Sequence, residues 1–229
     1  MRSKEPKPTS TPKVTRILIV DDHPMVRERV AEVINREGDL EVCGEAEDRH
    51  EALASIERLR PDLAIVDLTL KNSHGLELIR DIQLRFEGLR ILVLSMYDVP
   101  LYAQRSIRAG ALGYITKKEA TRNIIAAIRR VLSGQIYLSP NLATEITEQI
   151  FQPKPNAAAN PVDRLTDREL QVFELIGRRQ ASQQIADQLH LDIKTVDSYR
   201  SRLREKLSLK DADALVTFAV KWVRSSETA

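Results

Sequence analysis

Short apolar runs recur along the first half of this chain, and they constrain its fold more than any other feature of the sequence. The runs lie at 17–20, 63–68, 91–94 and 112–115, with a weaker one at 40–43. Runs of this length without polar alternation are typical of strands that are buried on both faces of a parallel sheet. Between them, apolar residues recur at spacings of three and four, as they do in helices with one buried face. Five strands alternating with five helices predict a doubly wound α/β domain.

The alternation stops after Gly134, and the rest of the chain has a different pattern. Pro140 suits the first turn of a helix, so we expect one helix near 140–151. Four short helical patterns follow, and the capping-box sequence from Thr166 to Glu169 opens the first of them. We therefore predict a disordered tail at 1–15, the α/β domain at 16–133, a linker at 134–162, a small all-α domain of four helices at 163–224, and a tail at 225–229.

Composition limits the cellular setting and the kinds of site. The single cysteine, Cys43, has no partner for an internal disulfide and cannot build a cysteine metal cluster. No apolar run reaches the ~18 residues of a membrane span, and the N-terminus lacks the apolar region of a secretory signal. We therefore expect a cytoplasmic protein without membrane contact. The 35 basic and 33 acidic residues give a net charge of +2, so any nucleic-acid binding must be confined to one region.

Polar residues stand where four of the predicted strands end, at the edge of a parallel sheet where ligands bind. They are three acids, a hydroxyl and a lysine: Asp21, Asp22, Asp67, Ser95 and Lys117. Converging carboxylates repel one another unless a cation lies between them, and oxygen ligands of this kind suit Mg²⁺. Asp67 is then a candidate nucleophile for phosphoryl transfer, with Ser95 and Lys117 as donors to the phosphoryl oxygens. The simpler alternative, strand-end caps and a solvated lysine, fits each residue alone but not all five together.

The motifs ILIVDDH, AIVDLTL, ILVLS and GYITKK, in this order and spacing, resemble the receiver domain of bacterial two-component response regulators. The resemblance covers residues 16–133 and implies a sheet with strand order 2-1-3-4-5. It implies that Asp67 accepts phosphate from a histidine kinase and that Ser95 and Lys117 contact the phosphoryl group. It also implies that Mg²⁺ is bound by Asp21, Asp22, Asp67 and the backbone carbonyl of Thr69. Ser95 and Tyr114 would then form a switch. Receivers often have proline where this chain has Lys71, so we expect a differently shaped loop from Lys71 to His74.

Three further residues, two of them near this edge, are expected to have no special role. His23 and His74 are lone loop histidines without partners at metal-ligand spacing, and we expect both on the surface. Cys43 lies in a predicted strand, where an inert small hydrophobic residue is the simplest interpretation.

The last domain holds the basic charge that the overall total conceals. Residues 194–210 have six basic and two acidic side chains, a net charge of +4, whereas residues 163–193 have a net charge of −2. A helix with an apolar stripe and a basic opposite face can enter the major groove of DNA and neutralise phosphates. Charge alone is also typical of a solvated helix in a bundle, so it leaves both interpretations open.

LTDRELQVFELI, IADQL and HLDIKTVDSYRSRLREKL resemble the LuxR-type helix-turn-helix domain of response regulators of the NarL/FixJ class. The match covers residues 163–224 and implies a scaffold helix at 185–189 and a recognition helix at 195–206. The implied DNA-facing residues are Lys194, Thr195, Ser198, Ser201, Arg202 and Lys206, with Asp197 as a candidate for setting sequence specificity. The implied dimer face on the last helix is formed by Leu215, Ala219 and Trp222. The residues that depart from the family pattern are Arg179, Ala181, Gln184 and Asp197.

Three functions are compatible with this sequence. The first is a bacterial transcription regulator that is controlled by phosphorylation of Asp67 and binds double-stranded DNA as a homodimer. The second is a hydrolase with an aspartate nucleophile, which is disfavoured because Thr69 stands where such enzymes have a second acid. The third is a receiver whose helical domain contacts a protein instead of DNA. We expect the first, a regulator that takes part in its own phosphorylation and dephosphorylation but is not otherwise an enzyme.

Overall fold

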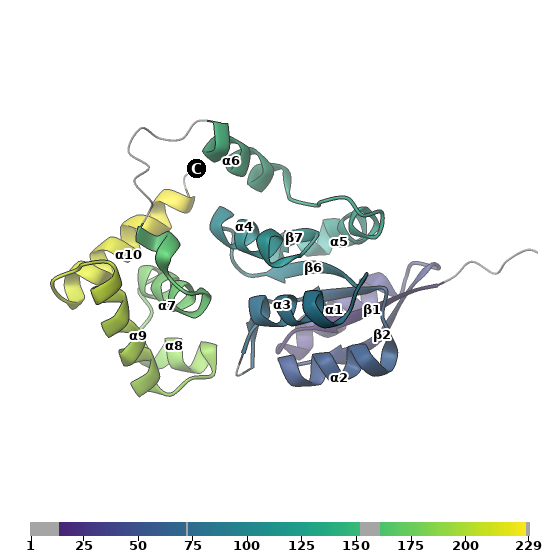
Figure 1. The fold of residues 1–229 in the computed structure, drawn as a ribbon, viewed down its shortest axis with the longest axis horizontal. Helices are drawn as coiled ribbons and strands as arrows, with labels where there is room; N and C mark the ends of the chain where they lie inside the picture. The colour runs from purple at the N-terminus through teal and green to yellow at the C-terminus, as the bar shows by residue number, and fades with distance from the viewer. Residues whose placement is uncertain (1–13, 72, 152–160, 228–229) are drawn as a thin grey trace, which may run out of the picture.

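The computed structural model describes residues 14–71, 73–151 and 161–227. Its first domain contains a five-stranded parallel sheet in the order β2-β1-β3-β6-β7, drawn in Figure 1. The strands are β1 (Thr15–Val20), β2 (Leu40–Ala46), β3 (Leu63–Val66), β6 (Arg90–Ser95) and β7 (Gly113–Thr116). Two short strands, β4 (Thr69–Leu70) and β5 (Ser73–His74), form a separate antiparallel hairpin. The predicted strand order 2-1-3-4-5 is therefore confirmed, and the hairpin is an addition to it.

Helices cover both faces of the sheet, because successive side chains of a strand point to opposite sides. One face, which includes Ile17 and Ile65, packs against α1 (Pro24–Ile34) and α5 (Lys117–Leu132). The other face, which includes Leu18, packs against α2 (Arg49–Leu59), α3 (Gly75–Arg85) and α4 (Pro100–Ala109). Burial on both faces explains why the strands appear in the sequence as unbroken apolar runs.

The C-terminal part is helical throughout the described residues. The predicted linker helix is present as α6 (Pro140–Phe151), and a 3₁₀ turn, η1 (Pro161–Arg164), leads into the last domain. Four helices follow: α7 (Asp167–Gly177), α8 (Ser182–Leu189), α9 (Ile193–Lys206) and α10 (Ala212–Glu227). At the start of α7, the predicted capping box is formed: the Glu169 amide donates to Thr166 Oγ1 over 3.3 Å, and the Thr166 amide donates to Glu169 Oε2 over 2.8 Å.

The end of α7 lies close to α10, which requires a residue without a side chain. A Cβ at Gly177 would come within 2.5 Å of the backbone oxygen of Ala219. Phe173, one turn earlier, contacts Phe218 and Trp222 with ring centroids 5.8 Å and 5.4 Å apart. These contacts fix α7 against α10 and give the helical domain its own apolar core.

The two domains lie against each other, with α7 and α8 near the edge of the sheet where the strands end (Figure 1). Buried apolar side chains continue from the β3–β4 segment and α4 of the first domain into α7 of the second. Asp167 at the start of α7 joins the domains electrostatically, because its carboxylate accepts hydrogen bonds from Arg80 of α3 and Arg105 of α4, each over 2.8 Å. The helical domain is thus docked on the end of the α/β domain.

Two elements extend past the predicted domain limits. Thr15 already belongs to β1, and α10 continues to Glu227 instead of ending at 224. Residues 1–13 of the predicted tail and 152–160 of the predicted linker lie outside the described residues. Within the described part of the chain, every helix is too short or too polar to cross a bilayer.

Candidate functional site

The acids and the lysine predicted at the strand ends meet at one point of the sheet edge. Asp21 follows β1 and Asp67 follows β3, and the pairing of Val20 with Val66 brings the two carboxylates side by side. Lys117, the first residue of α5, places its Nζ 2.7 Å from Asp21 Oδ2 and 2.8 Å from Asp67 Oδ2. Both aspartates are buried. The parallel sheet therefore assembles a buried acid–base cluster from three separate segments.

Burial and charge compete in setting the protonation of this cluster. Desolvation raises the pKa of Asp67, the nearby charge of Lys117 lowers it, and the carboxylate of Asp21 raises it again. Burial disfavours the charged form of Lys117, but the carboxylates of Asp67 and Asp21 outweigh burial and raise the pKa of the lysine. Lys117 therefore stays positively charged between the carboxylates of Asp21 and Asp67, which repel each other.

The donor set at this edge fits a divalent cation. One ligand atom from each of Asp21, Asp22, His23 and Asp67 can be chosen so that all lie within 4.8 Å of one another. Asp67 Oδ1 is buried and has no hydrogen-bond partner among the described residues, which is costly for a carboxylate unless a cation compensates. Carboxylate oxygens are the ligands that Mg²⁺ prefers. The expectation that His23 lacks partners at metal-ligand spacing is wrong, since the residue shares this cluster, although its side chain is exposed as predicted.

His74 differs from its prediction. We expected a surface residue, but the side chain is buried, and its Nδ1 accepts a hydrogen bond from the Leu76 amide over 3.0 Å as the N-cap of α3. Desolvation is the main cause that lowers the pKa of His74 to about 3. A lone histidine near a strand end gave no signal of burial, because its surroundings include residues of α7, far away in the sequence.

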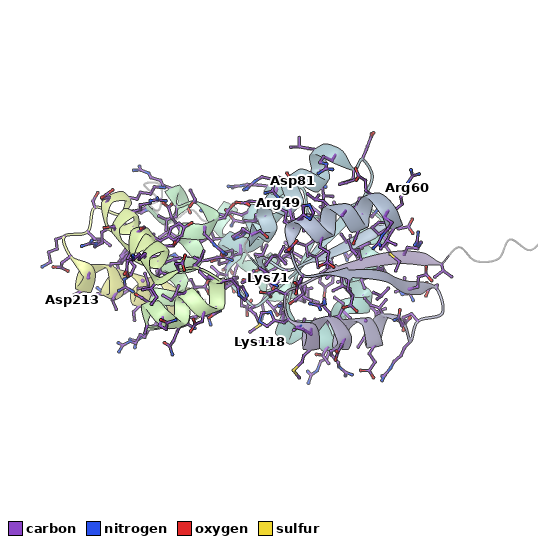
Figure 2. All side chains as sticks on the ribbon, turned by 90° about the horizontal axis from the view of Figure 1, so that it is seen from below. Arg49, Arg60, Lys71, Asp81, Lys118 and Asp213 are labelled. Carbon is purple, nitrogen blue, oxygen red and sulfur yellow. The ribbon has the colours of Figure 1, made fainter. Side chains whose placement is uncertain are left out.

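In the expected loop from Lys71 to His74, Ser73 and His74 form β5, which pairs with β4, and residue 72 lies outside the described residues. Lys71 extends to Glu47, with Nζ 2.8 Å from Oε1, and lies where the two domains meet in Figure 2. Gly75 closes the segment tightly, because a Cβ there would come within 2.0 Å of the backbone oxygen of Asp67. The paired strands are thus held close to Asp67, and the differently shaped loop expected from Lys71 stays a prediction.

The predicted switch residues share a neighbour that sequence reasoning missed, Tyr97. The Tyr97 amide donates to Ser95 Oγ over 3.1 Å, and the Tyr114 hydroxyl donates to the Tyr97 carbonyl over 2.6 Å. The Tyr97 hydroxyl lies 3.5 Å from Thr69 Oγ1, and its ring stacks on Tyr102 with centroids 4.6 Å apart. All of these side chains except that of Thr69 are at most 3% exposed. Tyr97 thus connects Ser95 and Tyr114 to the segment that follows Asp67.

The helix predicted to recognise DNA is α9, which lies farther from the sheet than α7 and α8 in Figure 1. Val196 and Leu203 are buried and hold it to the domain. Its exposed residues include the predicted DNA-facing side chains Lys194, Ser198, Arg202 and Lys206 together with Asp197, whereas Thr195 and Ser201 are half-buried. Two of these residues contact other helices of the domain: Asp197 Oδ1 accepts from Ser182 Oγ of α8 over 3.4 Å, and Lys206 Nζ lies 2.7 Å from Glu169 Oε2 of α7.

Known proteins match both domains of this chain. Residues 17–129 match the response regulator receiver domain, and residues 163–219 match the bacterial regulatory proteins of the luxR family. The response regulator GacA of Pseudomonas viridiflava is 34% identical over 206 residues, which cover 90% of this chain and 95% of GacA. This chain belongs to the LuxR-type response regulators, the NarL/FixJ class. The receiver and helix-turn-helix predictions are therefore confirmed.

Two solved structures of response regulators resemble this one. A LuxR-family two-component response regulator from Aurantimonas sp. SI85-9A1 has 36% identity and a TM-score of 0.58, and it covers 60% of this chain and 99% of its own. RcsB of Salmonella typhimurium, described in terms of conformational dynamism for DNA interaction, has 25% identity and a TM-score of 0.56 over 90% of this chain and 98% of its own.

The predicted dimer face of this response regulator needs a correction. Leu215 and Ala219 are fully buried, and α10 packs on α7 inside the domain. Trp222 is half-buried and contacts Phe173. The apolar spacing of α10 correctly indicated a buried face, but spacing does not distinguish a face buried within one domain from a face buried between two subunits.

Three of the four departures from the family pattern lie between α7 and the first turn of α8, and the fourth, Asp197, lies on α9. Arg179 has a φ of 61°, the left-handed conformation that glycine adopts at least cost. Ala181 is the N-cap of α8 and has no side-chain oxygen that could accept a backbone amide, while Gln184 Oε1 accepts the Ala181 amide over 2.8 Å. The start of α8 therefore has only one of the two hydrogen bonds of a capping box.

Proposed function

We propose that this response regulator is a DNA-binding transcription regulator, switched by phosphoryl transfer from a histidine kinase to Asp67. The observation that supports this proposal best is the state of the Asp67 carboxylate. Oδ2 is paired with Lys117, whereas Oδ1 is buried without a hydrogen-bond partner among the described residues. Oδ1 is thus the oxygen available to act as a nucleophile.

In the proposed transfer, an oxygen of Asp67 attacks the phosphorus of a phosphohistidine on the kinase. The P–N bond breaks, its electron pair returns to the imidazole of the kinase, and an acyl phosphate remains on Asp67. Lys117, whose raised pKa keeps it charged, and the Ser95 hydroxyl would donate to the phosphoryl oxygens. In this way the protein takes part in its own phosphorylation and, with water as the acceptor, in its dephosphorylation.

The residues that would hold Mg²⁺ are Asp21, Asp22, Asp67 and the backbone carbonyl of Thr69. When bound, this cation neutralises charge on the transferring phosphoryl group. The surrounding residues shield these three acids from bulk water, since the acid side chains are at most 3% exposed.

The phosphoryl group would change the contacts of Tyr97. Drawing the Ser95 hydroxyl toward phosphate removes the acceptor of the Tyr97 amide, which lies 3.1 Å away. Because Tyr114 donates to the carbonyl of Tyr97, both switch residues act on the same segment. We infer that this movement alters the packing of the receiver against the helical domain and against a second subunit, so that phosphorylation favours a homodimer.

The DNA-binding part of the proposal rests on the exposed surface of α9. Lys194 and Arg202 are exposed on this helix, and Asp197 stands between them in sequence. Basic side chains of this kind would contact DNA phosphates, and an acid can accept a hydrogen bond from the N4 amine of cytosine. A dimer would present two such helices to paired half-sites. Binding to DNA would place this bacterial regulator in the cytoplasm.

Treatment with acetyl phosphate and Mg²⁺ tests the proposal. Phosphorylated protein should dimerise and bind its DNA more tightly, whereas Asp67→Ala should show neither response. Arg36→Ala, which removes an exposed ion pair with Glu32 of α1, is the matched control and should respond like the unaltered protein. Equal behaviour of Asp67→Ala and the unaltered protein would refute phosphorylation control. Phosphorylation-dependent dimerisation without DNA binding at low salt would favour a protein-contact output instead.

A further inference from the structure

One residue of the helical domain reaches the phosphorylation edge of the receiver. His190 follows α8, and its Nε2 lies 2.8 Å from Asp22 Oδ2, although the two residues are 168 positions apart in sequence. His190 has a left-handed backbone, with φ of 51°, which turns the chain sharply at the end of α8. The ring nitrogen is within hydrogen-bond distance of a carboxylate that belongs to the cation cluster.

An imidazole nitrogen lies near each oxygen of Asp22, but only Oδ2 has a hydrogen-bond partner among the described residues. Oδ1 lies 2.6 Å from His23 Nδ1, and Oδ2 lies 2.8 Å from His190 Nε2. The Asp22 side chain is 3% exposed, whereas that of His190 is 42% exposed. The His190 ring therefore lies between the Asp22 carboxylate and the solvent. Mg²⁺ binds carboxylate oxygens at about 2.0–2.1 Å and needs near-ideal octahedral geometry, which an oxygen held by an imidazole N–H does not offer.

A second contact from the same domain reaches the other expected cation ligand. Gln171 of α7 is fully buried, and its side-chain amide donates to Thr69 Oγ1 over 3.4 Å and to the Leu68 carbonyl over 3.5 Å. Thr69 is the residue whose backbone carbonyl is expected to bind the cation. The docked domain thus touches the site at Asp22 and at Thr69.

The rest of the interface does not depend on these two contacts. Asp167 binds Arg80 and Arg105 over 2.8 Å each, and apolar residues of α7 continue the receiver core. His190 stands apart from this anchor, at the end of α8. Loss of the His190 contact would therefore weaken docking without removing the forces that hold the domains together.

We propose that the docked DNA-binding domain and the divalent cation compete for Asp22 through His190. Cation binding then breaks the His190 contact and loosens the helical domain before any phosphoryl transfer, and docking in turn lowers the affinity for the cation, as linkage requires. The inference rests on the proposed function, because it takes the acid cluster to be the cation site of the receiver. It adds that the output domain is itself part of that site.

The test measures Mg²⁺ affinity by isothermal titration calorimetry on the full chain. His190→Gly removes the imidazole and suits the left-handed backbone, so it should bind Mg²⁺ about 5-fold more tightly, the lower end of typical coupling between two sites. His190→Asn is a second variant, because asparagine also tolerates this conformation. His50→Ala, an exposed histidine of α2, is the control and should bind like the unaltered protein.

The second measurement follows the reciprocal effect, the loosening of the docked domain by Mg²⁺. In small-angle X-ray scattering, Mg²⁺ should increase the radius of gyration of the unaltered protein and of His50→Ala, and should change that of His190→Gly less. Equal Mg²⁺ affinity of His190→Gly and the unaltered protein would overturn the competition. Weaker binding by His190→Gly would also overturn it, because His190 would then be a cation ligand.

Phosphorylation by acetyl phosphate, followed in the same samples, separates this inference from the proposed function. Normal Mg²⁺-dependent phosphorylation of Asp67 with equal affinities refutes the competition alone. No Mg²⁺ binding and no phosphorylation in any of the proteins would refute the cation site together with the inference.

Discussion

Acid should destabilise this protein through His74, a buried residue that our sequence analysis placed on the surface. Its side chain is 2% exposed, Nδ1 accepts the Leu76 amide, and Nε2 has no partner among the described residues. Protonation would therefore create a buried charge and deprive the Leu76 amide of its acceptor. Among the charged groups around the ring, Asp167 favours the protonated form, while Arg168, Arg80 and Arg105 oppose it.

The size of the effect follows from the pKa. Burial lowers the pKa of His74 from its usual 6.5 to about 3. Between pH 6.5 and pH 3, this histidine is therefore protonated in the unfolded chain and neutral in the folded protein. The contribution of neutral His74 to the free energy of unfolding is complete above pH 6.5 and is lost as the pH falls toward 3. Between pH 7 and pH 5, the linkage relation gives a loss of about 2 kcal/mol in the free energy of unfolding.

The assay is urea denaturation at pH 7 and pH 5, followed by the fluorescence of the single tryptophan, Trp222. His74→Asn keeps an oxygen to cap α3 but does not titrate, so its loss of stability should be smaller by about 2 kcal/mol. His50→Asn alters an exposed histidine and should lose as much as the unaltered protein. The same pH dependence in His74→Asn and the unaltered protein would show that His74 is not held neutral by burial.

Three further predictions concern the helical domain. Gly177→Ala should lower stability by about 1–3 kcal/mol in thermal unfolding, because its Cβ would meet the Ala219 carbonyl at 2.5 Å; an unchanged melting temperature would contradict the close approach of α7 and α10. Lys194→Ala should reduce the slope of log affinity against log salt by about 1, whereas Lys221→Ala on α10 should not, and equal slopes would remove Lys194 from the interface. Asp197→Ala should change the relative affinities for different DNA sites more than the average affinity, and unchanged ratios in a binding selection would refute a role in specificity.

The docked arrangement gives the receiver two routes to its output domain. Tyr97 connects Ser95 and Tyr114 to Thr69, which Gln171 contacts, and His190 contacts Asp22 directly. The first route would respond to the phosphoryl group and the second to the cation. Both end on α7 and α8, the helices that support α9, so an event at the sheet edge can change how α9 is presented without touching it.

The sequence by itself determined the architecture and the main site. Unbroken apolar runs occur because the strands are buried on both faces, and the carboxyl ends of parallel strands necessarily share an edge. The sequence alone therefore predicts that Asp21, Asp67 and Lys117 lie close together. The capping box at Thr166 and the order of the helices were equally local, since caps and helical spacing depend on residues within a few positions of one another.

Only the tertiary structure decided which surfaces face each other. Leu215 and Ala219 are apolar at helical spacing whether α10 packs on α7 or on a second subunit, and only the fold shows that α7 covers them. The sequence predicted a surface position for His74 and no role for His190, because the acids near them, Asp167 and Asp22, lie about 90 and 168 positions away. Apolar periodicity and motifs indicate which side chains of a segment are buried and which residues cap a helix. Docking of two folded domains depends instead on the shape and charge of whole surfaces, which no local sequence pattern contains.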